Sequence, residues 1–60
     1  MAFTVTGVAN RGMALIGCDT VIHALAKATE MMRRGYLDVM IADRRGAQYT
    51  PDQFHRFFRS

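Results

Sequence analysis

The sequence is poor in cysteine, proline and tryptophan, and these shortages narrow the possible classes of protein. Its 60 residues include one Cys, one Pro and no Trp. A single Cys cannot form an internal disulfide framework, which excludes a secreted mini-protein held together by disulfides. One unpaired thiol fits a reducing compartment, so we expect the protein in the cytoplasm.

Long apolar runs and targeting signals are also missing. The uncharged stretch that follows Arg11 ends at Cys18, whereas a membrane-spanning helix needs about 20 apolar residues. The first residues, Met1 to Thr4, carry no basic side chain, whereas a signal peptide begins with one. We therefore expect no membrane segment and no membrane partner.

The chain length favours one small domain over residues 1–60, because domains rarely have fewer than about 50 residues. Half of the residues are apolar, which excludes a wholly disordered chain. A domain of 60 residues buries only about 60% of its unfolded surface, and this leaves little interior for a desolvated pocket. We therefore expect a protein that is not an enzyme.

The N-terminal half predicts a hairpin followed by a helix. Apolar residues alternate with Thr from Ala2 to Val8, as in a half-buried strand. The segment 10–12, Asn-Arg-Gly, predicts a turn, and the apolar run Met13 to Cys18 predicts the second strand. Asp19 or Thr20 then caps a helix that continues to about Arg34, before Gly35.

The C-terminal half predicts two more strands and a short helix. Leu37, Val39 and Ile41 alternate within the segment Tyr36 to Ala42, Asp43 to Gly46 forms a turn, and Ala47 to Tyr49 forms a short strand. Thr50 with Gln53 matches a capping box, Pro51 suits the first helical position, and Tyr49 and Phe54 occupy staple positions. The expected fold is α+β, ββαββα: a small, mainly antiparallel sheet packed on one main helix, with a short C-terminal helix.

Motifs for catalysis or cofactor binding are missing. Gly7, Gly12 and Gly17 recur every five residues, but no Gly-Lys-Ser/Thr follows, so they form no phosphate-binding loop. Cys18, Asp19, His23 and His55 lack the paired spacing of a structural zinc site. We expect no catalytic residues, no cofactor and no metal.

The basic residues allow a nucleic-acid interaction without favouring it. Eight Lys and Arg against five Asp and Glu give a net charge of +3. The predicted topology places Arg11, Arg33 and Arg34 at one end of the domain and Arg44 and Arg45 at the other. Such a spread is unlike the single basic stripe of a typical nucleic-acid-binding domain, so we expect weak contacts at most.

The excess of apolar residues points to self-association. One sheet face is expected to pack on the main helix through Phe3, Val5, Leu15, Leu37, Val39 and Ile41. That assignment leaves Val8, Ala14, Ile16 and Met40, together with Met13, on the opposite face or at its rim, and the first four are predicted as interface residues of a homodimer or small homo-oligomer. The alternative is that the C-terminal helix covers this face with Phe54, Phe57 and Phe58.

The sequence therefore predicts a small, non-enzymatic interaction or regulatory module that self-associates. The alternative function is a weak nucleic-acid-binding accessory protein that uses its dispersed arginines. The segment from Ala24 to Phe54 resembles parts of many small bacterial proteins, and this resemblance implies no activity.

Overall fold

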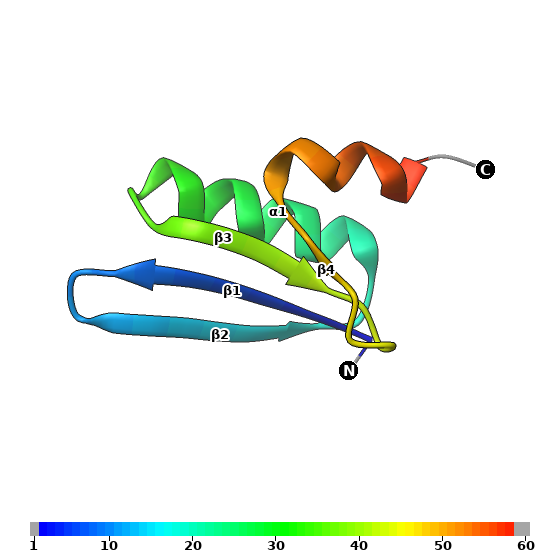
Figure 1. Cartoon of the computed structure of the whole chain (residues 1–60), viewed down its shortest axis with the longest axis horizontal. Coiled ribbons are helices and arrows are strands. Elements are labelled where there is room, and N and C mark those ends of the chain that lie inside the picture. Colours follow the sequence, from blue (N-terminus) through cyan, green and yellow to red (C-terminus); the bar gives the residue numbers. More distant parts are fainter. Residues whose placement is uncertain (1, 59–60) are drawn as a thin grey trace.

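Residues 2–58, which a computed structural model describes, are arranged in two layers: a four-stranded antiparallel sheet and a layer of two helices (Figure 1). The elements are β1 (Phe3–Ala9), β2 (Gly12–Cys18), α1 (Val21–Arg33), β3 (Leu37–Ala42), β4 (Gln48–Tyr49) and the 3₁₀ helix η1 (Pro51–Phe58). The strand order is β2-β1-β3-β4. The predicted ββαββα α+β fold is confirmed.

The core lies between α1 and the sheet. Val5 of β1 and Ile41 of β3 are fully buried and lie opposite each other in the ladder. The helix contributes Ala24 and Ala28, whose small side chains let its backbone approach the strands, and Met31 beside them. The buried face of α1 therefore centres on Ala24, Ala28 and Met31.

Gly7 provides the space that the end of α1 needs. A Cβ atom at this position would lie 2.7 Å from the Met31 Cε atom and 3.3 Å from atoms of Tyr36 and Val39. Real Cβ atoms do not come as close as 2.7 Å to another atom, so a larger residue here requires the flexible end of the Met31 side chain to move, and its contacts with Tyr36 and Val39 are tight.

The predicted caps and turns are confirmed for the helix α1 and for the β3–β4 turn. The Thr20 hydroxyl accepts a hydrogen bond from the His23 N–H at 3.2 Å, and Gly35 follows the helix with φ of +90°. In the second turn the Asp43 carboxylate accepts N–H bonds from Arg45 and Ala47 at 2.9 and 3.0 Å. The turns predicted before and after β3 are therefore both present in the structure.

The start of η1 differs in detail from a capping box. The Thr50 N–H donates to the Gln53 side-chain oxygen at 3.2 Å, as predicted, but the Thr50 hydroxyl donates to the Asp52 carboxylate. The ring of Tyr49 packs on Phe57, with centroids 4.5 Å apart, and not on Phe54 as a hydrophobic staple would require. A 3₁₀ helix has three residues per turn, which aligns Phe57 with Phe54. The side chain of Phe58 lies outside the described part of the structure.

Two residues predicted for the core are exposed. Leu15 is 70% exposed and Leu37 is 69% exposed. The β1–β2 turn has two residues, so that Ala9 pairs with Gly12; a three-residue turn would have placed Leu15 on the helix side. A bulge in β3 opposite the step from Thr6 to Val8, with Asp38 at φ of +53°, turns Leu37 away from the core.

Candidate interaction surface

The face of the sheet that points away from α1 is open. Both helices lie on the same side of the sheet in Figure 1, and Phe57 of η1 contacts Phe3 with ring centroids 6.0 Å apart. Phe54 and Phe57 pack against the α1-side core. The alternative in which the C-terminal helix covers the open face is therefore wrong for the residues that the structure describes.

The open face carries several large apolar side chains among smaller polar ones. Strand alternation places Thr4, Thr6 and Val8 of β1 on it, with Met13 and Leu15 of β2 and Met40 of β3. Met13 and Leu15 are each 70% exposed. Clustered apolar side chains at a surface are typical of an interface.

The outer strand β2 is unprotected as an edge. Its seven residues, Gly-Met-Ala-Leu-Ile-Gly-Cys, include no charge and no proline. Natural edge strands avoid pairing with other chains by being short, or by carrying Lys, Pro or a bulge. By these criteria β2 is free to pair with a further strand.

The opposite edge of the sheet carries these protections. Strand β4 has only two residues, and it pairs with Ile41 and Ala42 of β3. The rest of the β3 edge has the charged bulge residue Asp38, and Pro51 lies beside it in the same surface groove. The molecule thus has one protected edge and one unprotected edge.

The predicted interface residues fall on both faces of the sheet. Val8 and Met40 lie on the open face, as expected. Ala14 and Ile16 lie on the helix side and pack against the core cluster, because the two-residue turn reverses the predicted facing of β2. Met13, also predicted for this face or its rim, is 70% exposed on it. Sequence reasoning missed Leu15 as a surface candidate, although the uncharged sequence of β2 carried the signal for a free edge.

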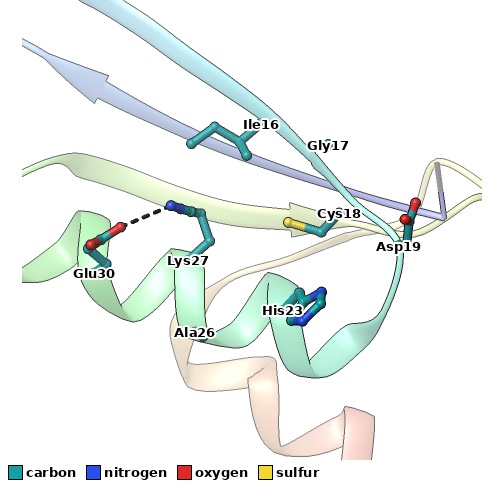
Figure 2. A pocket seen from close by; sticks show the side chains of 8 residues that line it. All are labelled: Ile16, Gly17, Cys18, Asp19, His23, Ala26, Lys27 and Glu30. Carbon is teal, nitrogen blue, oxygen red and sulfur yellow. Dashed lines mark hydrogen bonds and ion pairs between the residues drawn. The ribbon is translucent and has the colours of Figure 1, made fainter.

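A groove runs between β2 and α1, because the helix packs mainly over β1 and β3 and covers β2 less. Figure 2 shows the residues that line it: Ile16, Gly17, Cys18, Asp19, His23, Ala26, Lys27 and Glu30. Cys18 is buried and its thiol is free. Among the side chains drawn in Figure 2, no hydrogen bond joins Cys18 to His23.

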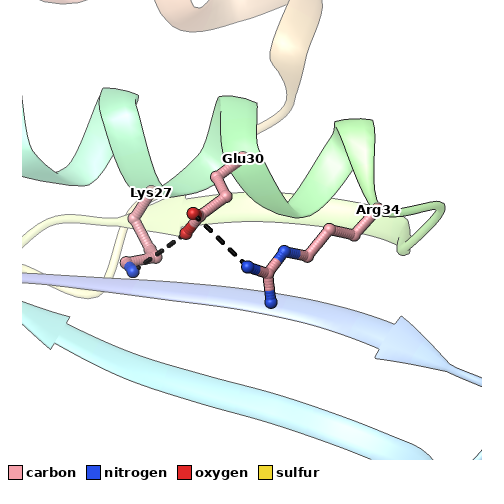
Figure 3. Close-up of polar contacts among 3 residues, drawn as sticks. All are labelled: Lys27, Glu30 and Arg34. Carbon is pink, nitrogen blue, oxygen red and sulfur yellow. Dashed lines mark hydrogen bonds and ion pairs between the residues drawn. The ribbon is translucent and has the colours of Figure 1, made fainter.

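Two of the residues lining this groove, Lys27 and Glu30 of α1, form an ion pair, and Glu30 also pairs with Arg34, which follows the helix (Figure 3). Glu30 bonds to Lys27 at 3.0 Å and to Arg34 at 3.6 Å. The hydrogen bond and charge of Lys27, and then the charge of Arg34, hold the pKa of the Glu30 carboxyl below its ordinary value. Glu30 therefore stays ionised at neutral pH, and this side of the helix presents both signs of charge.

The arginines lie at two ends of the domain, as the sequence predicted. The β1–β2 turn with Arg11 and the end of α1 with Arg33 and Arg34 lie together at the left of Figure 1. The turn with Arg44 and Arg45 lies at the right. Since Arg34 also pairs with Glu30, the structure gathers no single basic stripe from these residues.

No group of metal-ligating side chains occurs among residues 2–58, and no helix in that range is both long enough and apolar enough to span a bilayer. No protein-family model matches the chain, and no curated protein or solved structure matches it at a significant level.

Proposed function

We propose that this chain is a small, non-enzymatic interaction module of the cytoplasm that acts by self-association. The observation that carries the proposal is the unprotected strand β2 next to an open, partly apolar sheet face. Burial of free thiol Cys18 is compatible with a reducing compartment. Of the predicted interface residues, Ala14 and Ile16 belong to β2 itself, and Val8 and Met40 lie on the open face of the neighbouring strands.

The size of the domain supports association. A chain this short gains limited stability from its own core, and exposed Met13 and Leu15 add apolar surface that remains in contact with water. Burying such side chains against a second chain stabilises each by about 1–2 kcal/mol. Association therefore adds to the stability of the isolated domain.

The mass of the protein in solution tests the proposal. We expect light scattering to show the 6.8 kDa monomer at low concentration and twice that mass at higher concentration. Met13→Lys is expected to shift this transition to higher concentration. A 6.8 kDa species throughout the range up to about 1 mM, well above the micromolar affinities of weak complexes, would contradict the proposal.

Ile22→Lys is the matched control for that substitution. Ile22 is an exposed apolar residue, as Met13 is, but it lies on α1. The Ile22→Lys variant should leave the concentration of the monomer–dimer transition unchanged. If both variants shift the transition equally, general surface hydrophobicity and not the β2 region drives association.

A further inference from the structure

We propose that β2 pairs antiparallel with β2 of a second copy of this chain, across a two-fold axis that passes beside Leu15. This assignment rests on the self-association proposed above and adds its surface and its register. The two sheets then form one continuous sheet, with four strands from each copy.

Every second residue of β2 has its backbone N–H and C=O groups directed toward the free edge, where a second strand can bond to them. In an antiparallel ladder, opposed pairs that exchange hydrogen bonds alternate with pairs that do not. The two-residue turn makes Ala9 and Gly12 an exchanging pair, so the even-numbered residues of β2 bond to β1. The N–H and C=O groups that point to the free edge are those of Met13, Leu15 and Gly17.

Charge complementarity selects the register. When Leu15 lies on the axis, each residue before it faces the residue at the same distance after it in the other copy. Arg11, four places before Leu15, then lies across from Asp19 of the partner subunit, four places after it. The pair occurs twice, once at each end of the paired strands, and opposite charges in this relation stabilise a sheet.

Neighbouring registers lose this match. Moving the axis to Ala14 places Arg11 across from the partner's Gly17, and moving it to Ile16 places it across from the partner's Val21. Both shifts also shorten the overlap of the two strands. The register centred on Leu15 is the one that pairs all of β2 together with both flanking charges.

Side-chain sizes fit the same register. On the open face, Leu15 lies against its own copy, and Met13 lies against the partner's Gly17, which has no side chain to obstruct it. On the helix side, Ile16 lies against the partner's Ala14. Each large side chain outside the axis therefore meets a small one, and no charge within β2 opposes its copy.

The extent of the contact sets the expected affinity. The three outward-facing residues of each copy give about six intermolecular backbone hydrogen bonds. At one hydrogen bond per roughly 100–200 Å² of interface, these correspond to about 600–1,200 Å² of buried surface. This range includes the small, reversible interfaces, so we expect a dissociation constant on the order of micromolar.

Disulfide trapping tests the register directly. In a Cys18→Ala background, Leu15→Cys places two thiols in a hydrogen-bonded antiparallel pair, with Cα atoms about 5.5 Å apart, inside the range of about 4.4–6.8 Å that a disulfide spans. We expect rapid formation of a covalent dimer under mild oxidation, at concentrations where light scattering shows the dimer.

Two matched controls share the same background. Met13→Cys is as exposed as Leu15→Cys on the same strand, but the two copies of residue 13 lie about 13 Å apart along the strand. Thr6→Cys lies opposite Leu15 within each monomer, and its two copies are about 14 Å apart across the sheet. Neither should cross-link at a comparable rate.

Amide hydrogen exchange of the unaltered protein provides a second measurement. We expect the amides of Met13, Leu15 and Gly17 to become at least tenfold more protected on going from monomer to dimer. The amides of Ala14 and Ile16, which bond to β1, should change less.

The outcomes separate the two proposals. A monomer at all concentrations overturns both. A dimer in which Leu15→Cys does not cross-link and the outward amides stay unprotected overturns β2 pairing but leaves self-association intact. A dimer that is trapped faster by Met13→Cys than by Leu15→Cys overturns the register. Rapid trapping by Leu15→Cys with protected outward amides supports the full assignment.

Discussion

Leu15→Lys should dissociate the dimer while leaving the monomer folded. Leu15 is 70% exposed in the monomer, and substitutions at such positions change the free energy of unfolding by no more than about 0.5 kcal/mol. In the paired state, two lysines would lie directly opposite each other. Urea denaturation at concentrations below the dimer transition checks the monomer, and sedimentation equilibrium checks the dimer.

The expected loss of affinity follows from two contributions. Two like charges about 6 Å apart repel by about 0.7 kcal/mol at the dielectric constant of water and by about 3 kcal/mol at an effective value of 20. Losing the apolar contact between the two leucines adds about 1 kcal/mol. A total of about 2–4 kcal/mol corresponds to a dissociation constant roughly 30 to 1,000 times higher.

Mixing two variants that carry opposite charges at position 15 tests whether residue 15 of one copy faces residue 15 of the other. Leu15→Glu should weaken the homodimer in the same way, and a mixture of Leu15→Lys with Leu15→Glu should form a heterodimer tighter than either homodimer. Met13→Lys, whose residue faces the partner's Gly17, should weaken the dimer less than Leu15→Lys does. If the mixture recovers no affinity, or if Met13→Lys has the larger effect, the reasoning about the register is refuted.

Three further results are expected. Met40→Lys should leave the dimer unchanged within about threefold, because Met40 lies on β3, two strands from the β2 edge; loss of the dimer in sedimentation would indicate packing through the open faces instead. Thr50→Ala should lower the free energy of unfolding by about 0.5 kcal/mol, at the low end for a cap, because the Thr50 hydroxyl bonds to Asp52 and the Gln53 bond is kept. It should also raise the pKa of the Asp52 carboxyl, which the Thr50 hydroxyl lowers most, as carbon-detected NMR titration will show; an unchanged pKa contradicts the assigned bond. Nucleic-acid binding should be weak and independent of sequence, and with about three phosphate contacts a doubling of salt should reduce it about six- to sevenfold; sub-micromolar binding to a defined duplex at about 150 mM salt, a concentration that screens such contacts, would contradict this expectation.

The sequence predicted the order of the elements because each one carries local signals that agree. Thr20 and Gly35 bound the helix, and Asp43 and Gly46 form the turn that follows β3. These features depend on side chains and backbones within a few residues of one another. Long-range packing was not needed to predict them.

The facing of β2 was predicted wrongly because it depends on one residue in a turn. Counting Gly12 as part of the turn makes the loop three residues long and places Leu15 on the helix side. In the structure Gly12 is the first residue of β2 and adopts φ of +130°, so that the loop has two residues. A slip of one residue turns every side chain of the strand to the other face.

The facing of Leu37 depended on a feature that simple alternation does not reveal. The bulge at Asp38 requires a positive φ, which Asp tolerates better than most residues. An Asp within an otherwise apolar strand was the only local sign of it. The predicted interface was wrong for the same reason. Ile16 was predicted for the open face but packs against the core, and Leu15 was predicted for the core but lies on the open face.

The two-residue strand β4 limits how far such an assembly can grow. After two copies join through β2, both outer edges of the combined sheet are the protected β3–β4 edges, so a third copy finds no free strand to extend. The proposed dimer is therefore expected to be closed at two copies and not to extend into fibres. The proposed β2 pairing would also bury the unprotected edge of the sheet that residues 2–58 form, so that we expect the dilute monomer, and not the concentrated dimer, to be the species more exposed to misassembly.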